Sequence, residues 1–520
     1  MVRNGTGDFV IEGGGARQEM LDSVAAGRAF SLSMDGPVRR VRRTWLDTFD
    51  WRLYRAGLSL EQQASGNGSE LVLTGRDGER LAGLPVSNGT APSWPSLITA
   101  LPPGPLRELI EPVVGIRALA PVARAASKIH CRRALNADAK TVARLAVDEM
   151  SVTYPARAQA PPRLSVAAVR GYQAQADRIS DTLADAAGIR PSRQSALEAA
   201  LAAVGEQPGK RPADVQLLPA MPAATAMAAI LGAQFDAVEA NLPGTIRDID
   251  TEFLHDLRVA IRRTRSALKL CGQALPDGLA AAYRPEFRWI GDLTTPTRDL
   301  DVYLLGFGDM VTGLVGAAPE DLDPFREYLL RTRAAAHREL ARGLHSARFA
   351  RLARQWRGDL AAVRPARRRL TVARLAGQRI AVAQRQALRA GLRITGGSPA
   401  QDLHDLRKDC KELRYLIEMF GSLHDPAQRW QAIRELKNLQ DCLGAFQDAE
   451  VQRAELRAFA ERMLAQRSAP APTLLAMGEI AAGLARRQRE ARADFDSRFA
   501  AFAGRASQAR LAALTQVSAA

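Results

Sequence analysis

The sequence predicts a multidomain α+β protein in which a strand-rich N-terminal part precedes an all-helical part. Short runs of alternating apolar and polar residues, separated by Gly, Ser and Thr clusters, fill the chain up to about Gly205. From Thr225 to about Leu514 the composition changes to Ala, Leu and Arg, with apolar residues at helical spacing. The proline-rich stretch Gly205–Ala224 lies between the two parts and is typical of a linker.

The N-terminal domain is expected to span residues 1–211 and to contain several strands followed by one helix, Ala174–Val204. The linker is expected at residues 212–224, and the helical domain at residues 225–510. Strands are predicted at Arg39–Leu46, Leu58–Gln62, Glu70–Thr74, Ser151–Tyr154 and Leu164–Val169. Helix breaks are predicted at Leu242–Gly244, Leu275–Gly278, Gly313–Pro324, Gly396–Pro399 and Arg467–Pro472, which leaves a bundle of long helices with short connections.

A ladder of basic side chains marks one face of the helix predicted over Leu254–Leu270. At about 100° per residue, one histidine and four cations project within about 80° of one another, next to an arc of apolar residues. These basic positions are His255, Arg258, Arg262, Arg265 and Lys269. The helix therefore offers a row of positive charge along one side.

The opening of this helix, LHDLR, occurs a second time in Leu403–Met419, at an offset of 149 residues (404 − 255). The offset places His404, Arg407, Lys411 and Arg414 under the first four basic positions, whereas Glu418 falls under Lys269. It also pairs Arg288 with Lys437, Asp299 with Asp448, Asp301 with Glu450, and Val302 with Val451. The helical domain is therefore expected to contain two repeats, at about residues 225–360 and 370–505.

A third basic helix is predicted between the two ladders, over Phe325–Gly358. Arg331, Arg338, Arg342 and His345 fall within about 60° on its helical wheel. This stripe could extend the same basic lining.

The charge balance favours an anionic partner. The chain of 520 residues carries a formal net charge of +16, whereas aromatic residues make up only 5%, few for a protein that stacks on bases. The four cysteines show no C-x-x-C spacing, which favours a reducing compartment over a disulfide framework or zinc site. No signal peptide or run of eighteen apolar residues is found, so we expect a cytoplasmic protein without membrane partners.

LHDLR followed by spaced Arg and Lys, twice, each time with a following D-x-(D/E)-V, resembles the CHAD domain, the conserved-histidine α-helical domain. The resemblance covers roughly Pro219–Arg505. It implies two related helix bundles about a pseudo-twofold axis, whose basic residues face a central channel that binds inorganic polyphosphate. It also implies a possible association with polyphosphate granules. The polyphosphate ligands assigned on this basis are His255, Arg258, Arg262, Arg265, Lys269, Arg288, Arg338, His404, Arg407, Lys411, Arg414 and Lys437.

The N-terminal part resembles the CYTH domain, the triphosphate-tunnel fold, in Thr44–Glu61, Ser69–Gly75 and Ile116–Leu135. The resemblance implies an antiparallel β-barrel. That family opens with a strand of alternating glutamates and a lysine, whereas FVIEGGG here offers Glu12 alone. Magnesium bridging a triphosphate needs several converging carboxylates, so we predict a degenerate domain with no catalytic residue, metal or other cofactor.

Three alternatives remain open. The N-terminal domain could be a metal-dependent triphosphatase. The chain could instead bind nucleic acid, because basic helices also serve duplex binding. The His-Asp dipeptides at positions 255, 404 and 424 are also found in metal-dependent HD phosphohydrolases, although further converging His and Asp ligands are not evident. The oligomeric state stays undetermined.

Overall fold

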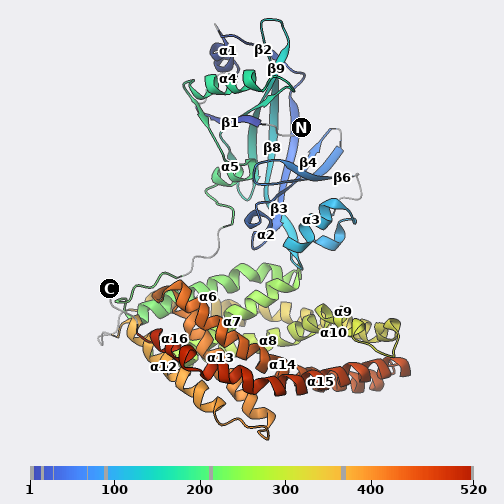
Figure 1. The fold of residues 1–520 in the computed structure, drawn as a ribbon, viewed down its shortest axis with the longest axis vertical. Coiled ribbons are helices and arrows are strands. Elements are labelled where there is room, and N and C mark those ends of the chain that lie inside the picture. The colour runs from blue at the N-terminus through green and yellow to red at the C-terminus, as the bar shows by residue number, and fades with distance from the viewer. Residues whose placement is uncertain are drawn as a thin grey trace. The chain divides into compact units, whose positions relative to one another are not determined.

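The computed structural model describes residues 5–12, 17–26, 28–66, 68–86, 92–209, 215–364 and 370–516. The chain divides into two compact units, Met1–Arg211 and Pro212–Ala520 (Figure 1). The first unit contains the strands, and the second is helical. This is the α+β class that the sequence predicts.

The N-terminal unit is built on one antiparallel sheet. Its main path runs β12-β1-β11-β9-β8-β3-β4-β5-β6, while β10 pairs with β9 and both β2 and β7 pair with β8. The strands are β1 (Gly5–Ile11), β2 (Ser31–Met34), β3 (Arg39–Thr48), β4 (Ser59–Ser65), β5 (Gly68–Thr74), β6 (Arg80–Val86), β7 (Ser96–Leu97), β8 (Ala118–Leu135), β9 (Thr141–Tyr154), β10 (Ala158–Gln159), β11 (Arg163–Ala168) and β12 (Ile189–Pro191). Each of the five strands expected from the sequence overlaps one of these, with Leu58 and Val169 lying one residue outside β4 and β11.

The sheet is open, so the expected closure into a barrel is wrong for the described residues. Strands β6 and β12 end the hydrogen-bonded path and are not paired with each other. Pro85 lies in β6 and Pro191 lies in the three-residue β12. Because proline has no N–H to donate to a further strand, both segments suit an edge better than an interior position.

Short helices accompany the sheet. They are α1 (Arg17–Ala25), α2 (Arg52–Arg55), η1 (Ile98–Ala100), α3 (Pro105–Val114), α4 (Gln173–Ala184) and α5 (Ala196–Ala202). The single helix predicted over Ala174–Val204 is therefore wrong. Gly188 adopts a φ of 81° and β12 follows at once, pairing with β1. A new helix starts only at Ser195, whose side chain accepts from the Glu198 amide in a capping box.

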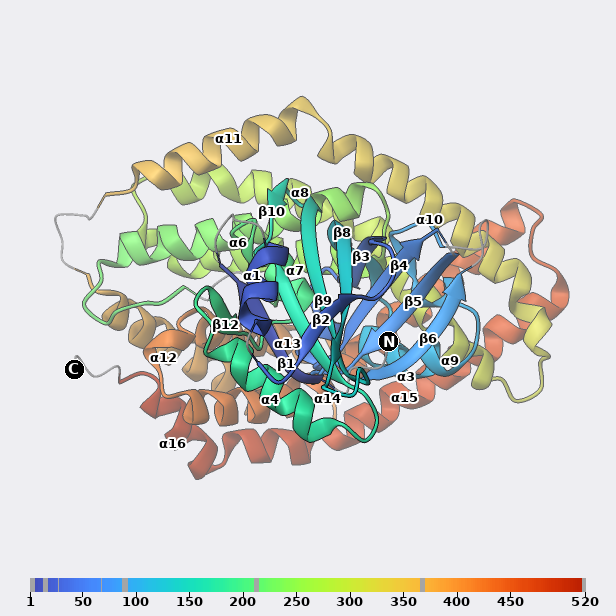
Figure 2. The same ribbon diagram turned by 90° about the horizontal axis from the view of Figure 1, so that it is seen from above.

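The helical unit contains long helices joined by short connections. They are α6 (Ala223–Ile246), α7 (Thr251–Cys271), η2 (Gly272–Ala274), α8 (Leu279–Leu305), α9 (Phe307–Thr312), η3 (Pro319–Leu322), α10 (Asp323–Leu344), α11 (Ala347–Ala362), α12 (Val372–Gly391), α13 (Ala400–Met419), η4 (Gly421–Leu423), α14 (Pro426–Ala465), α15 (Ala471–Ala503) and α16 (Arg505–Ala513). Figure 2 shows α6, α8 and α11 along one side of the unit and α12, α15 and α16 along the other. Among the described residues, no helix is long and apolar enough to cross a bilayer.

Several helix boundaries differ from expectation: α8 and α9 are divided at Gly306 and α15 and α16 at Gly504, and two further differences have a clear cause. The helix α6 continues through Pro243 to Ile246, with Gly244 packed so closely that an added Cβ would lie 2.2 Å from the Phe253 ring. The predicted helix Phe325–Gly358 is two helices, because the Ser346 side chain accepts the Phe349 amide and caps α11. Such a polar N-cap interrupts a pattern that side-chain periodicity alone reads as continuous.

One apolar core spans both halves of the helical unit. The leucines of the two LHDLR copies, Leu254 and Leu257 on α7 and Leu403 and Leu406 on α13, are at most 3% exposed and belong to it. Burial of the leucines places the His and Arg of each motif on a neighbouring face of its helix, at the margin of the core. The repeated motif therefore fixes which face of α7 and of α13 points away from the core.

An ion-pair cluster connects α8 and α10. Arg333 donates to Asp301 over 2.7 Å and to Asp248 over 2.6 Å. Asp301 is 1% exposed, and burial raises its pKa even though Arg333 opposes the shift. Asp301, one of the repeat-matched acids, thus has a clear role in holding an arginine.

Replacing Asp301 with alanine should lower the free energy of unfolding by about 3 kcal/mol, because Arg333 would lose its most buried partner. Denaturant unfolding followed by far-UV circular dichroism measures this loss. Glu450→Ala is the matched control, since Glu450 occupies the equivalent position in the second repeat and has no ion-pair partner among the described residues. Equal effects of the two variants would contradict the assignment.

Candidate functional site

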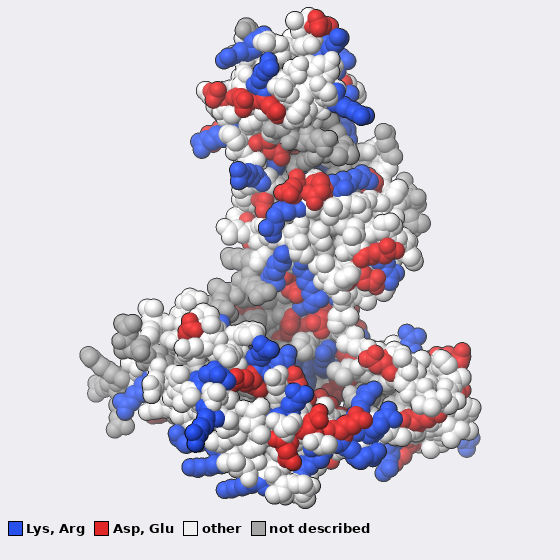
Figure 3. Space-filling model, viewed as in Figure 1, with Lys and Arg blue, Asp and Glu red and all other residues white. Residues whose placement is uncertain are grey.

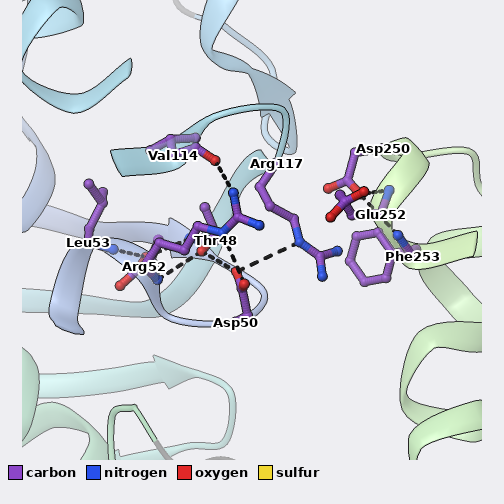
Figure 4. Close-up of polar contacts among 10 residues, drawn as sticks. Thr48, Asp50, Arg52, Leu53, Val114, Arg117, Asp250, Glu252 and Phe253 are labelled. Atoms are coloured by element: carbon purple, nitrogen blue, oxygen red, sulfur yellow. Dashed lines mark hydrogen bonds and ion pairs between the residues drawn. The ribbon is translucent and has the colours of Figure 1, made fainter. Parts of the chain in front are cut away.

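The first basic ladder lies on α7, whose start is fixed by a side-chain cap. The Asp250 carboxylate accepts hydrogen bonds from the backbone amides of Glu252 and Phe253 (Figure 4). Along the helix, His255 and Arg258 are partly buried, whereas Arg262, Arg265 and Lys269 are exposed. The basic side chains near the start of α7 are therefore partly buried, and those further along the helix are exposed to solvent.

Arg258 is held firmly against α8. Its Nη1 donates to the Thr294 hydroxyl over 2.8 Å and to the Thr295 hydroxyl over 2.9 Å. Burial lowers the pKa of the Arg258 guanidinium; the nearby cations act in the same direction, and Asp299 opposes them. Arg258 thus contributes positive charge from a fixed position rather than from a mobile side chain.

The second ladder on α13 repeats this arrangement with different partners. Arg407 donates from Nη2 to Asp448 on α14 over 2.9 Å, and Asp448 is the repeat counterpart of Asp299. The Nδ1 atom of His404 lies 2.8 Å from the Gln447 side-chain oxygen. The repeat-matched acids thus act on arginines, in the second repeat through the ion pair of Asp448 with Arg407 and in the first through the charge of Asp299 on Arg258.

The two histidines have different neighbours. His404 lies beside the Gln447 amide, and the residue equivalent to Gln447 in the first repeat is Arg298, a cation near His255. Burial and the charge of Arg298 lower the pKa of His255, against the opposing effect of nearby acids. The imidazole is therefore neutral at pH 7 in the free protein.

Repeat-related cations face one another across the α7–α13 contact. The Arg262 guanidinium carbon lies 5.9 Å from the centre of the Tyr415 ring, and that of Arg414 lies 5.6 Å from it. Burial, Arg407 and Arg262 lower the pKa of Lys411 to about 8. Because Lys411 is the counterpart of Arg262, equivalent rungs of the two ladders approach each other.

Two ion pairs between α7 and α13 lie beside Arg262 and Lys411, and the repeat offset relates one pair to the other. Arg263 on α7 donates to Glu418 on α13 over 3.3 Å, and Lys269 on α7 pairs with Glu412 on α13. The offset of 149 relates Arg263 to Glu412 and Lys269 to Glu418. Each pair therefore maps onto the other with its charges reversed, as expected for a two-fold relation between α7 and α13. The carboxylate of Glu418, which shortens the second ladder, thus serves this contact.

An open groove of about 1020 Å³ lies between α7 and α8. One wall carries Arg262, Arg265 and Lys269, and the other carries Arg284 and Arg288, together with Trp289 and Asp292. Four of the predicted ligands thus line one groove, in which five cations accompany one carboxylate. Elsewhere, on the face seen in Figure 3, acidic and basic side chains of the helical unit are interspersed.

Arg284 was missed by the sequence analysis because its repeat counterpart is Ile433. It donates to the Leu268 carbonyl over 2.7 Å near the end of α7, while it also lines the groove. The spacing Arg284–Arg288, one helical turn on α8, is the signal that could have revealed it. Comparison of the two repeats identifies basic positions that both copies share, and it does not identify a basic residue that occurs in one copy alone.

The remaining predicted ligands lie outside the groove. Lys437 is exposed on α14, at the position equivalent to Arg288, and Arg338 is exposed on α10. On the predicted third stripe, Arg331 pairs with Glu327 at 3.9 Å and Arg342 pairs with Glu339, all four side chains being well exposed. These two arginines therefore resemble ordinary solvated helix pairs more than a ligand surface.

In the N-terminal unit, several carboxylates have cationic partners. Glu12 pairs with Arg190 at 2.7 Å. Arg43 donates to Glu61 over 2.7 Å and to Asp148 over 2.9 Å, and its guanidinium lies 4.7 Å from the Trp45 ring centre. Asp50 accepts from Arg52 over 3.0 Å beside Thr48 (Figure 4). No group of three or more His, Cys, Asp or Glu residues placed to hold a metal occurs in the part of the chain that the structure describes.

The helical unit matches a known family and known structures. Residues 229–457 match the family model described as the CHAD domain. The crystal structure of the CHAD domain from the plant Ricinus communis is similar at 23% identity and a TM-score of 0.47, over 56% of this chain and 96% of that one. PptA from Streptomyces chartreusis is similar at 19% identity and a TM-score of 0.43, over 54% of this chain and 99% of that one. A search of curated proteins gave no match.

Replacing Lys411 with methionine should stabilise the ligand-free protein at pH 7 by on the order of 1 kcal/mol, because a partly buried charge beside other cations is removed. Since the folded-state pKa is about 8, below the ordinary value, the penalty is full below pH 8 and vanishes as the pH rises past the ordinary value near 10.5. Thermal unfolding at both ends of this range measures the difference.

Lys408→Met is the matched control for this variant. Lys408 lies on the same helix but pairs with Asp405 at 3.0 Å on an exposed surface, so its loss should change stability little. A Lys411→Met protein that is less stable than the Lys408→Met protein at pH 7 would contradict the electrostatic account of the site.

Proposed function

Residues 229–457 of this chain are a CHAD domain, and we propose that this domain binds inorganic polyphosphate along the basic groove of α7 and α8 and the adjoining ladder of α13. The observation that carries the proposal is the concentration of cations from both repeats around Arg262. The groove adds four further cations on its two walls. A protein with this property would associate with polyphosphate granules.

The spacing of the ladder suits a linear polyanion. Rungs three or four residues apart rise about 5 to 6 Å along the helix, so that one chain of phosphates can contact several of them in turn. Arginine side chains such as Arg262 and Arg265 can each bind two phosphate oxygens through the planar guanidinium. Such a ladder contacts only phosphate groups and distinguishes no order of monomers, and polyphosphate consists of identical units.

The electrostatics of the free site also favour an anion. Lys411 lies among Arg407, Arg262 and Arg414, and its lowered pKa reflects both burial and this crowding. Arg258 has a lowered pKa for the same two reasons. A bound polyanion would relieve the repulsion between these groups, so binding gains energy that a scattered basic surface does not offer.

The two histidines can add hydrogen bonds to phosphate beside the charged residues of the ladders. Because Nδ1 of His404 is engaged with Gln447, only Nε2 is available to a phosphate oxygen. His255 is neutral in the free protein, and a nearby phosphate would favour its charged form. Both remain proposed ligands, with the arginines and Lys411 supplying most of the charge.

A triple variant, Arg262→Ala, Arg265→Ala and Arg288→Ala, should weaken binding of long-chain polyphosphate roughly 100-fold, at about 1 kcal/mol for each lost cation. These three are chosen because they are exposed, whereas Arg258 and Arg407 also hold their helices. Isothermal titration calorimetry of the full chain measures the change. The control triple, Arg374→Ala, Arg385→Ala and Arg389→Ala, removes the same charge from exposed positions on α12; equal losses in both proteins would refute the groove assignment.

The affinity for long-chain polyphosphate should fall between about pH 7 and pH 9, by at most about tenfold per pH unit. A bound anion favours protonated Lys411, so binding takes up a proton where free Lys411, with its pKa of about 8, has lost one. Internal phosphates of a long chain do not titrate in this range. In Lys411→Arg the cation persists at all these pH values, so its affinity should be nearly flat. An equal fall in this variant would assign the pH dependence to another group.

A further inference from the structure

The α8 wall of the groove has two different stripes. Arg284, Arg288 and Asp292 are spaced one turn apart, and so are Pro285, Trp289 and Leu293. All six residues line the groove. One side of the wall is therefore charged, and the other is apolar and includes an indole ring.

A purely inorganic phosphate chain uses only part of this wall. Phosphate oxygens gain nothing from contact with an apolar stripe, and the exposed Asp292 carboxylate repels them. A carboxylate instead accepts hydrogen bonds from N–H and O–H groups. The lining thus suits a ligand that joins phosphates to a ring bearing such donors.

The indole of Trp289 is held in place for contact with such a ring. The Arg348 guanidinium lies 4.2 Å from the Trp289 ring centre, and Arg348 itself donates to Glu286 over 2.9 Å. Trp289 is partly exposed and lines the groove beside Arg288. A fixed aromatic ring next to phosphate-binding arginines can stack a nucleobase without selecting its identity.

We propose that the groove binds nucleoside polyphosphates, with the phosphates on the cations of α7 and α8, the base against Trp289, and Asp292 accepting from a base or ribose donor. The groove volume of about 1020 Å³ lies just above the usual range for small-molecule sites, about 300 to 1,000 Å³, so the groove has room for a nucleotide. This inference rests on the proposed function, because it uses the same cations, and it extends the ligand class beyond inorganic chains.

The test compares adenosine 5′-triphosphate with inorganic tripolyphosphate, which has the same number of phosphates, on the full-length protein without divalent metal. The nucleotide should bind roughly tenfold more tightly. Trp289→Leu, which keeps an apolar side chain, should remove this advantage and leave tripolyphosphate binding unchanged. Trp430→Leu is the control, because Trp430 is also beside an arginine, Arg434 at 5.3 Å, but lies on α14 and is 62% exposed.

Asp292→Asn gives a second test that does not disturb packing, since Asp292 is exposed. Removing the negative charge should strengthen tripolyphosphate binding and narrow the difference between the two ligands. Equal affinities of the two ligands for the native protein, or equal weakening of both by Trp289→Leu, would overturn the inference. If Arg262→Ala, Arg265→Ala and Arg288→Ala together leave tripolyphosphate binding unchanged, the proposed polyphosphate function fails as well.

Discussion

The contact between α7 and α13 is the constraint on which the helical unit depends. It brings together Arg262 and Lys411, equivalent residues of two repeats that repel each other. The buried leucines of both LHDLR copies lie in the shared core, and the crossed ion pairs of Arg263 with Glu418 and Lys269 with Glu412 flank the approach. Apolar burial and two reversed ion pairs thus hold a cluster of like charges that would otherwise separate.

Some buried arginines are matched by carboxylates, whereas other buried cations are not. In the N-terminal unit, Arg43 lies between two carboxylates, and its pKa is raised because they more than offset its burial. In the helical unit, Arg333 is paired with two carboxylates in the same way, whereas Arg258 and Lys411 have lowered pKa values chiefly because they are buried, with nearby cations adding to the shift. Charge that is matched within the protein stabilises the fold, whereas unmatched charge is available to a ligand. The unmatched cations of the helical unit therefore support the proposal that this unit binds an anion.

Much of this site could be predicted from the sequence, because a duplicated motif reports geometry that a single helix does not. The offset of 149 identified the rungs, and helical periodicity gave the face on which His255 and Arg262 lie. Arg284 was not predicted because its counterpart in the second repeat is not basic. The ion pair of Lys269 with Glu412 was not predicted because it joins residues far apart in the sequence, which no local pattern indicates. The sequence also could not predict whether the sheet is open or closed, because closure depends on pairing between edge strands that are distant in the sequence.

The most direct measurement is a calorimetric titration of the full chain with long-chain polyphosphate and with duplex DNA, at matched phosphate concentration and at two salt concentrations. A shaped site with fixed arginines should hold polyphosphate tightly at the higher salt, while DNA, bound by general attraction alone, should dissociate. Equal affinities with equal salt dependence would contradict the account, because the ladders would then act as a general basic surface.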